Sequence, residues 1–518
     1  MGILVLDFGS QYSHLICRRL REICAYSELR SCSISLAEIQ AFNPSAIILS
    51  GGPSSVYETD APHLSLEMWQ WMQVNDVPVL GICYGLQEMV HALGGRVEKG
   101  SKREFGLAEL RVGESGGLFD GMSSNSVWMS HGDKVTALPS GFVVLASSES
   151  TEYCAIADVH RRFFGVQFHP EVAHTPQGAR LLGNFCRIAN CKLDWNMHAF
   201  VETELASLQD KIGPDVHVVG AVSGGVDSTV AAALLHKAIG NRFHPFMIDT
   251  GLLRKDEASE VKKRLEKHLS GMQLTVIDES ERFYEALAGL RDPEAKRKAI
   301  GRLFIECFER AVVEVLGMDP KKCLLLQGTL YPDVIESSSH KGPSHTIKTH
   351  HNVGGLPERM QMRILEPLRM LFKDEVRALG RELGLPNESV NRHPFPGPGL
   401  AIRIKGEVTR ERADVLREAD RIFIEELKRA GEYDRISQAL AILCPEVQTV
   451  GVMGDGRTYE MLCCLRAVES SDFMTADWYR MPYDLLALIS SRITNEVSGI
   501  NRVCYDISSK PPATIEWE

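Results

Sequence analysis

Apolar residues along the first third of the chain form short runs that alternate with longer amphipathic segments. Runs rich in β-branched residues indicate strands at residues 3–6, 46–49 and 77–82, and helical spacing begins near Gln11 and near Gly85. Strands that alternate with helices in this way are typical of a parallel sheet covered by helices. Residues 2–189 are therefore predicted to form an α/β domain.

The best-defined of these helices follows the strand at residues 77–82. Its apolar positions recur at helical spacing, and a pair of glycines is expected to end it. These residues are Leu86, Met89, Val90 and Leu93, followed by Gly94 and Gly95. The pattern places Cys83 at the turn between the strand and the helix.

A second alternating stretch begins after a polar connector at residues 190–196. A helix at about 177–189 is predicted to close the first domain before this connector. The second stretch has strand patterns at 216–222, 243–248, 274–277 and 323–326, a glycine-rich turn at 223–228 and a helix at 229–239. This order is that of a second doubly wound α/β unit.

A proline-rich segment marks the end of that unit. Three prolines between His393 and Gly399 lack backbone donors and have a fixed φ, so the segment cannot be a helix or a central strand. An apolar helix is expected around residues 485–493 of the α+β region that follows. We therefore predict an α/β protein with two doubly wound parallel-sheet domains and a smaller α+β C-terminal domain. The predicted domain bounds are 1–194, 195–394 and 395–518.

The length and the charge of the chain limit its possible roles. With 518 residues it is long enough for about three domains of roughly 100 to 200 residues each. Its 57 Lys and Arg residues against 68 Asp and Glu residues leave a net charge of −11. This balance argues against binding to a phosphate backbone, so we expect no nucleic-acid partner.

The sequence also lacks targeting signals. No basic region precedes the first apolar run, which reaches Asp7, and Leu6 is not the Ser or Thr of a myristoylation signal. No uncharged stretch approaches the roughly 20 apolar residues of a membrane helix. The 13 cysteines are scattered without a C-x-x-C pair, which fits reduced thiols. We expect a cytoplasmic protein that does not bind membranes.

Cys83 is the candidate nucleophile of a first site. A helix N-terminus and a nearby base lower the pKa of a thiol, and flanking glycines allow the tight turn that exposes it. His169 can serve as the base while Glu171 orients its ring, which completes a candidate catalytic triad. The backbone amides of Gly52 and Tyr84 are the candidate oxyanion donors.

These residues resemble the class I, or triad, glutamine amidotransferase family over residues 1 to about 190. The resemblance implies that Cys83 forms a γ-glutamyl thioester and releases ammonia from glutamine. It also implies that glutamine is bound by Gln87, Ser130, His131 and Asp133. From the residues alone, the segment 130–133 could also be a plain surface turn.

A second candidate site lies at residues 223–228, where Ser-Gly-Gly-Val-Asp-Ser follows a strand and opens a helix. Successive backbone amides can hold an anion there, and the helix dipole supports it. The simplest alternative is a flexible glycine–serine turn. The segment resembles the loop of ATP pyrophosphatases, which implies cleavage of ATP to AMP and pyrophosphate. The implied ATP-binding residues are Ser223, Gly224, Gly225, Val226, Asp227, Ser228 and Thr229.

Asp227 is the candidate Mg²⁺ ligand of this second site. Carboxylate oxygens suit Mg²⁺, and ATP brings most of the other ligands. No organic cofactor is expected. Lys373 is a further candidate phosphate contact, although a solvated helix charge is the simpler interpretation for a lysine in that position.

Further segments extend the resemblance to the whole chain. They are residues 300–302, 327–329, 333–337, 350–352 and the ending Lys-Pro-Pro-Ala-Thr-Ile-Glu-Trp-Glu at 510–518. With them the chain is similar to the glutamine-hydrolysing GMP synthetases, whereas by itself the ending could be a terminal edge strand. The resemblance implies a C-terminal domain that dimerises and completes the nucleotide site. The implied XMP-binding residues are Arg297, Asp333, Glu336, Gln438, Arg502, Lys510 and Glu516.

This resemblance implies a homodimeric ligase of purine biosynthesis that uses glutamine, ATP and XMP. ATP would adenylate O2 of XMP, ammonia would displace AMP, and the products would be GMP, AMP, pyrophosphate and glutamate. One alternative is another glutamine-dependent adenylating ligase, NAD synthetase-like or tRNA-modifying, with a different acceptor; the negative net charge disfavours tRNA. A non-catalytic nucleotide sensor is the other alternative, and the complete triad argues against it.

Overall fold

The computed structural model of this chain describes residues 2–113, 117–333, 362–453, 456–470, 473 and 475–518. The described residues fall into two compact units, the first ending at Phe200 and the second beginning at Val201. Within these ranges, no helix combines the length and the apolar character needed to cross a bilayer.

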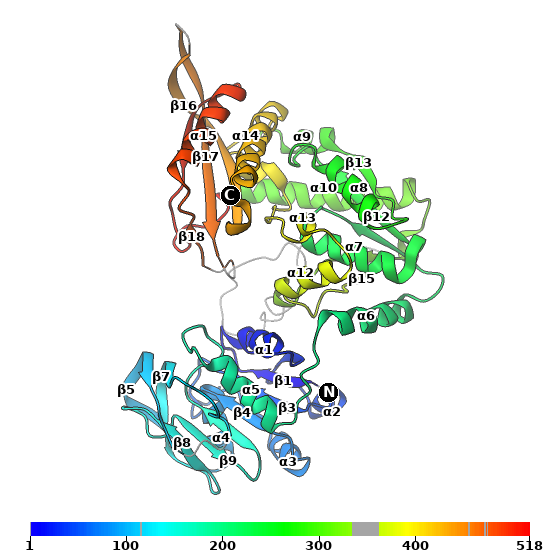
Figure 1. Cartoon of the computed structure of the whole chain (residues 1–518). Helices are drawn as coiled ribbons and strands as arrows, with labels where there is room; N and C mark the ends of the chain where they lie inside the picture. The colour runs from blue at the N-terminus through cyan, green and yellow to red at the C-terminus, as the bar shows by residue number, and fades with distance from the viewer. Residues whose placement is uncertain (1, 114–116, 334–361, 454–455, 471–472, 474) are drawn as a thin grey trace. The chain divides into compact units, whose positions relative to one another are not determined.

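The first unit is built on an eight-stranded sheet with the order β2-β1-β3-β4-β10-β9-β8-β6. Figure 1 labels β1, β3, β4, β8 and β9 of this sheet. The five strands from β2 to β10 are parallel, as predicted, and the last three are antiparallel, so the sheet is mixed. The strands are β1 (Ile3–Asp7), β2 (Ser27–Ser31), β3 (Ala46–Leu49), β4 (Val79–Ile82), β6 (Arg111–Val112), β8 (Val143–Ser147), β9 (Ala155–Asp158) and β10 (Phe163–Val166).

Helices cover both faces of this sheet because its strands are apolar on both sides. On β10, Phe163 contacts Trp69 of α3, and the next residue, Phe164, contacts Phe185 of α5. The helices are α1 (Ser13–Glu22), α2 (Leu36–Phe42), α3 (Leu66–Val74), α4 (Tyr84–Ala92) and α5 (Gly178–Ile188). Two long antiparallel strands, β5 (Arg96–Glu109) and β7 (Ser126–Ala137), form a separate ribbon (Figure 1).

The second unit contains a five-stranded, fully parallel sheet with the order β13-β12-β11-β14-β15. Its strands are β11 (His217–Ala221), β12 (Phe243–Asp249), β13 (Thr275–Asp278), β14 (Cys323–Leu326) and β15 (Arg363–Leu365). Its helices are α6 (Met197–Ile212), α7 (Val226–Ile239), α8 (Glu257–His268), α9 (Ser280–Leu287), α10 (Pro293–Glu314), α12 (Lys373–Glu382) and α13 (Asn387–Val390). The reversal of strand order at β11 is the doubly wound arrangement that the sequence predicts.

A second sheet follows in the same unit. Antiparallel strands β16 (Gln438–Met453), β17 (Gly456–Glu469) and β18 (Asp477–Trp478) are joined by β19 (Ile500–Tyr505), which runs parallel to β17. The helices here are α14 (Arg410–Arg429) and α15 (Tyr483–Glu496). Short 3₁₀ helices complete the unit: η1 (Gly240–Arg242), η2 (Pro320–Lys322), η4 (Gly399–Arg403) and η5 (Tyr433–Arg435).

One apolar core runs through both sheets of the second unit. Phe246 of β12 and Phe308 of α10 meet edge to face, and Phe423 of α14 and Ile489 of α15 belong to the same cluster. The proline-rich segment at residues 393–398 has neither helix nor strand, as predicted, but the core continues across it. The division of this unit at residues 394 and 395 stays a prediction.

The end of the chain is not the terminal edge strand that the sequence left as an alternative. Only Lys510 forms a β-bridge, with Ala476, and residues 511–518 adopt turns and bends. The physical reason is that buried cations bind the carbonyl and carboxylate oxygens of this segment: Arg466 donates to the carbonyls of Thr514 and Ile515. The tail is therefore held by side chains rather than by a strand partner.

Candidate functional site

The candidate residues of the first unit gather where parallel strands end. Ser50–Gly52 follow β3, Cys83 follows β4, and the segment with His169 follows β10. These three strands are neighbours in the sheet, and Val166 of β10 lies opposite Ile82 of β4. Carboxyl ends of adjacent parallel strands are the usual binding edge of an α/β sheet, so the register alone brings these segments together.

Cys83 occupies a strained turn between β4 and α4. Its φ of 53° and ψ of −104° lie outside the regions that non-glycine residues ordinarily adopt. The flanking glycines are required by space: a Cβ on Gly85 would collide with the backbone of Leu49, and one on Gly81 would lie 2.5 Å from the carbonyl oxygen of Gly85. This confirms the tight, glycine-flanked turn that the sequence predicts.

The environment of the Cys83 sulfur is polar although the residue is only 7% exposed. The thiol lies 3.8 Å from the carbonyl oxygen of Ser130, and the Gln167 amide nitrogen lies 3.7 Å from the sulfur. The Cys83 side chain also raises the pKa of His169, so the imidazole lies near the sulfur. The sulfur therefore lies among polar groups rather than in an apolar core: the Gln167 amide can donate to a thiolate, whereas the Ser130 carbonyl can only accept from the thiol.

His169 and Glu171 are a buried pair. Nδ1 of His169 lies 2.7 Å from Oε1 of Glu171, and the two residues are 4% and 1% exposed. Burial lowers the pKa of His169, but the Glu171 carboxylate and the Cys83 side chain raise it more, to about 11. The structure thus joins Cys83, His169 and Glu171 in the order sulfur, imidazole, carboxylate.

The backbone around His169 is fixed from three sides. Its N–H donates to the carbonyl of Trp128 at 3.0 Å, and the hydroxyl of Thr175 donates to its carbonyl at 2.7 Å. The guanidinium of Arg19 donates to the carbonyl of Glu171 at 3.1 Å. These bonds limit rotation of the segment that carries the imidazole and the carboxylate.

Of the two predicted oxyanion donors, Tyr84 directly follows Cys83. Tyr84 is the first residue of α4, so its N–H has no carbonyl one turn earlier in the helix. A Cβ on Gly51 would lie 3.2 Å from Cε1 of His169, and one on Gly52 would lie 2.7 Å from the carbonyl oxygen of Phe8. The 51–52 loop therefore passes close to the imidazole, and a side chain at Gly52 would collide with the backbone.

The predicted glutamine-binding residues lie around the same sulfur. Residues 130–133 belong to strand β7, so the alternative of a surface turn is wrong. The Gln87 amide donates to the carbonyl of Asp133 and to the side-chain oxygen of Gln167, at 3.2 and 3.3 Å. The side chain of Asp133 accepts from the Tyr57 hydroxyl at 2.9 Å.

Two residues that the sequence did not single out support this site. Gln167 is fully buried between Gln87 and Cys83, and Glu104 of β5 lies 3.2 Å from Nε2 of His131. Burial lowers the pKa of His131 against the opposing effects of the Asp133 carbonyl and the Glu104 carboxylate. Gln167 could have been found from its position one residue past β10, directly opposite Cys83. Glu104 carries no comparable signal.

The second candidate loop connects β11 to α7 in the other unit. Its backbone is closed by serine hydroxyls: the Ser223 N–H donates to Oγ of Ser228 at 3.2 Å, and the Gly225 N–H donates to Oγ of Ser223 at 3.3 Å. Gly224 has a φ of +76°, and a Cβ there would lie 2.6 Å from Val261. The loop is closed by these bonds, and Val226 and Thr229 are buried in the helix that follows.

Asp227 and Lys373 meet although they are far apart in the sequence. Nζ of Lys373, the first residue of α12, lies 2.7 and 2.5 Å from the two carboxylate oxygens of Asp227. Lys373 is therefore an ion-pair partner at the loop, not a solvated helix charge. Arg392, which the sequence did not indicate, donates to the carbonyl of Gly224 at 2.9 Å and pairs with Glu257.

The predicted XMP residues are only partly brought together. Gln438 donates to Glu516 at 2.7 Å, and the buried Arg403 donates to the same carboxylate at 2.8 and 3.1 Å. Arg297 donates to the backbone carbonyl of Glu518, and Lys510 donates to the carbonyl of Phe473 at 2.6 Å. Arg403 and Phe473 were not anticipated from the sequence.

Two other predicted XMP residues have different surroundings. Asp333 accepts a hydrogen bond from the Leu330 N–H at 2.9 Å, and Arg502 is exposed on β19. Glu336 lies outside the described residues, as do most of the segment 333–337 and all of 350–352.

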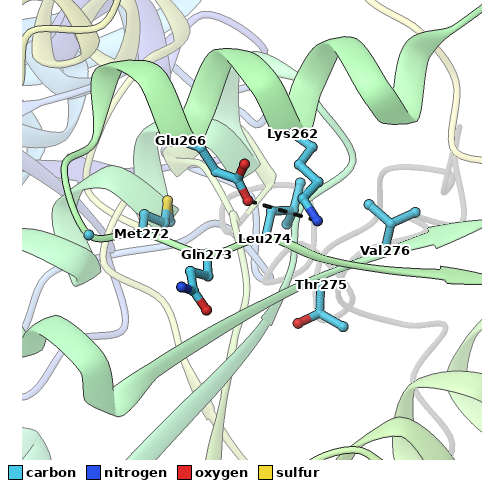
Figure 2. A pocket seen from close by; sticks show the side chains of 8 residues that line it. Lys262, Glu266, Met272, Gln273, Leu274, Thr275 and Val276 are labelled. Atoms are coloured by element: carbon cyan, nitrogen blue, oxygen red, sulfur yellow. Dashed lines mark ion pairs between the residues drawn. The ribbon is translucent and has the colours of Figure 1, made fainter.

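A surface cavity of about 640 Å³ lies elsewhere in the second unit, between α8 and β13 (Figure 2). Lys262 and Glu266 line it from the helix, with 3.9 Å between Nζ and Oε1, and residues 272–276 line the other side. It contains none of the predicted site residues.

Comparisons with known proteins cover both units. Residues 4–189 match the family model described as glutamine amidotransferase class-I, and residues 425–517 match the model described as GMP synthase C terminal domain. Over its whole length the chain is similar to proteins named GMP synthase [glutamine-hydrolyzing]. Identity is 55% with that of Kluyveromyces lactis and 54% with those of Saccharomyces cerevisiae and Phenylobacterium zucineum, covering 98% of each relative.

Proposed function

This chain belongs to the family of glutamine-hydrolysing GMP synthases and is a ligase that converts XMP to GMP in a glutamine-dependent reaction, and we propose that each of its two units carries out one half of this reaction. Glutamine and XMP are its substrates together with ATP. The observation that carries the proposal is that one chain, similar to these enzymes over its full length, holds a Cys–His–Glu cluster in one unit and a serine–glycine loop in the other.

The first unit releases ammonia from glutamine. The Cys83 sulfur attacks the side-chain amide carbon while His169, oriented by Glu171, carries the proton to the departing ammonia. The backbone amides of Gly52 and Tyr84 stabilise the oxyanion, and loss of one such donor typically costs about 3 kcal/mol of transition-state stabilisation. Gln87, Ser130, His131 and Asp133 bind the rest of glutamine. Water then releases glutamate from the thioester.

The second unit activates XMP. Residues 223–229 and Lys373 bind the β- and γ-phosphates of ATP, with backbone amides at the start of α7 facing the anion. The XMP oxygen O2 attacks the α-phosphorus, and pyrophosphate departs. Ammonia then attacks the activated carbon, AMP leaves, and GMP is formed.

Mg²⁺ is the proposed cofactor of this half. Among the described residues no cluster of three His, Cys, Asp or Glu side chains could hold a metal ion. The Asp227 carboxylate at the loop fits a single protein ligand to an ion that the ATP phosphates otherwise coordinate. When bound, Mg²⁺ would neutralise phosphate charge, and no organic cofactor is proposed.

XMP is proposed to bind at the end of the chain. Arg297, Asp333, Glu336, Gln438, Arg502, Lys510 and Glu516 are the proposed contacts. The Gln438–Glu516 bond and the anchored tail support this assignment for part of the set. We further propose three domains with bounds at 194/195 and 394/395, a homodimer through the C-terminal domain, no nucleic-acid or membrane partner, and a cytoplasmic location.

A product assay tests the proposal. Purified protein is incubated with XMP, Mg-ATP and glutamine, and the nucleotides are separated by chromatography. We expect GMP and AMP in equal amounts with pyrophosphate and glutamate. Absence of GMP, or ADP in place of AMP, would reject it. Deamido-NAD in place of XMP serves as the control acceptor and should give no product.

A further inference from the structure

The helix α5 ends in a turn that brings two cysteines together. The N–H of Cys191 donates to the carbonyl of Cys186 at 2.8 Å, and the N–H of Asn190 donates to the carbonyl of Arg187 at 3.1 Å. Asn190 has a φ of +51°, the left-handed conformation that closes such a turn. This is the Schellman motif, in which the side chains three residues before the cap and two after it meet. Here both side chains are thiols.

The turn places the two thiol side chains next to each other but in different surroundings. Cys186 is fully buried. Cys191 is partly exposed and lines a surface cavity of about 670 Å³ together with Ile23, Asn184 and Leu193. A small oxidant can therefore reach Cys191 directly, whereas Cys186 is shielded from solvent.

Their acid–base properties follow the same asymmetry. The neighbouring Cys186 thiol lowers the pKa of Cys191, and the Cys191 thiol, with burial, raises the pKa of Cys186. The thiolate is the reactive form towards peroxides. Cys191 is therefore the attacking sulfur and Cys186 the resolving one.

The adjacent cysteines Cys463 and Cys464 of β17 cannot pair with each other, because their side chains point to opposite faces of the sheet. Cys464 lies opposite Cys504 of β19 in the sheet register rather than in a helix-ending turn. Cys154 is buried, and burial raises its pKa to about 12. Alanine or leucine could also make the apolar contact of this turn, but neither would place two thiols next to each other near the surface.

We propose that Cys186 and Cys191 form an oxidisable dithiol site that hydrogen peroxide converts to an intramolecular disulfide. The Cys191 thiolate attacks one peroxide oxygen, which gives a sulfenic acid and hydroxide. The Cys186 sulfur then attacks the sulfenic sulfur, its proton leaves with the displaced hydroxyl as water, and the S–S bond forms. Two thiols lose two electrons, and one peroxide becomes two waters.

The bond would fasten the connector that follows α5 to the helix itself. Residues 190–196 lead from the first unit to α6, and the Trp195 N–H donates to the carbonyl of Cys24. A thiol reductant is expected to reverse the reaction, because thiolates exchange with accessible disulfides.

Peptide mapping of the full-length native protein tests this site. The protein is treated with hydrogen peroxide, its free thiols are blocked with iodoacetamide, and it is digested with trypsin, which cuts after Arg180, Arg187 and Lys192. We expect peptides 181–187 and 188–192 to appear as one species, about 2 Da lighter than their sum, because disulfide formation removes two hydrogens. Dithiothreitol should separate them.

Matched variants make the result decisive. Cys191→Ser should abolish the linked species, whereas Cys24→Ser, which removes an exposed cysteine of the same unit, should leave its yield unchanged. Oxidation of Cys191 to sulfinic acid without the linked species would overturn the proposal. So would a linked species that forms only after the protein is unfolded in urea.

Discussion

At the scale of single residues, the thiol site depends on side chains that act through their neighbours. Glu171 keeps the imidazole of His169 charged. The Gln167 amide nitrogen donates to the Cys83 sulfur, and the Gln167 amide oxygen accepts from Gln87. A buried donor aimed at a thiolate stabilises it more than a donor in water would, because few other dipoles compete there. Such residues tune the nucleophile without being nucleophiles themselves.

Replacing Glu171 should change how stability depends on pH. The pKa of His169 in the folded protein is about 11, above its ordinary value of 6.5, mainly because Glu171 outweighs the effect of burial. A raised folded pKa contributes stability that is fully present below pH 6.5 and is lost as pH rises to 11. Glu171→Gln should therefore lower the free energy of unfolding at pH 6 but much less at pH 11, measured by urea denaturation. An equal loss at both values would contradict this assignment.

Removing the Gln167 donor should slow the alkylation of the Cys83 thiol. Gln167→Met keeps the side-chain volume but loses the hydrogen bond to Cys83, which is worth about 1 to 1.5 kcal/mol. The rate of Cys83 alkylation should therefore fall about tenfold. Iodoacetamide labelling followed by mass spectrometry measures this rate. Gln70→Met, on the exposed side of α3, is the control and should label like the parent protein. An unchanged rate in Gln167→Met would remove Gln167 from the site.

At the scale of elements, the site depends on how closely α5 approaches the segment after β10. Gly178 begins α5 against the carbonyl of Pro170, and a Cβ on Gly178 would overlap that oxygen. Pro170 lies between His169 and Glu171 in the chain. The packing of a helix end therefore sets the position of two triad members.

Gly178→Ala should destabilise the first unit and its chemistry together. Overpacking of this kind typically costs about 1 to 3 kcal/mol, and the displaced segment should lower glutamine hydrolysis as well. Thermal unfolding and a glutaminase assay measure the two effects. Gly183→Ala in the same helix is the matched control: its Cβ would meet only Ile23 at 3.8 Å, so a gain of about 0.5 to 1 kcal/mol is expected there. A stable, active Gly178→Ala variant would show that the helix end can shift freely.

At the scale of the whole molecule, each unit has its own sheet and its own loop. The thiol cluster uses strands β3, β4 and β10, and the serine–glycine loop follows β11. The core of the second unit continues from its parallel sheet to its final strands, and buried cations on α10 and β17 bind the tail: Lys296 binds Glu518 and Arg466 binds the carbonyl of Ile515. Two chemistries in one chain are therefore expected to be separable by mutation.

Cys83→Ala should separate them. Synthesis of GMP from glutamine should be lost, while synthesis from added ammonium salts should remain near that of the parent protein, because the 223–228 loop is built by the other unit. Chromatography of GMP with each nitrogen source measures both activities. Folded protein that has lost both activities would contradict two independent sites.

Lys296 should couple the tail to the synthetase core. Its buried ammonium lies 2.6 Å from the carboxylate of Glu518 and 2.8 Å from the carbonyl of Ile404. Lys296→Met removes the closer of two cations from that carboxylate, while Lys405 stays 3.1 Å from its other oxygen. Loss of a hydrogen bond to a charged group typically costs about 1.5 to 3 kcal/mol. We expect a lower Tm and a raised KM for XMP with ammonium as the nitrogen source. Lys298→Met, exposed on the same helix, should change neither; a KM unchanged in Lys296→Met would exclude the coupling.

Local patterns were enough to predict many elements. The strands at residues 46–49 and 323–326 have the predicted bounds, and the helix after Cys83 begins one residue before the predicted start. The antiparallel half of the first sheet and the ribbon of β5 and β7 were not predicted, because pairing between distant strands leaves little local trace. The alternative of a terminal edge strand is wrong for the tail, since the Arg466 side chain binds its backbone carbonyls.

By itself the sequence determined the chemistry that local geometry carries: a cysteine between two glycines at a helix start, a His-Pro-Glu segment, and a serine–glycine turn that opens a helix. Only the tertiary structure decided the partners. Gln167 meets Cys83, Glu104 meets His131, and Lys373 meets Asp227. The reason is physical: φ and ψ preferences act within a few residues, whereas these contacts depend on the register and order of strands far apart in the chain.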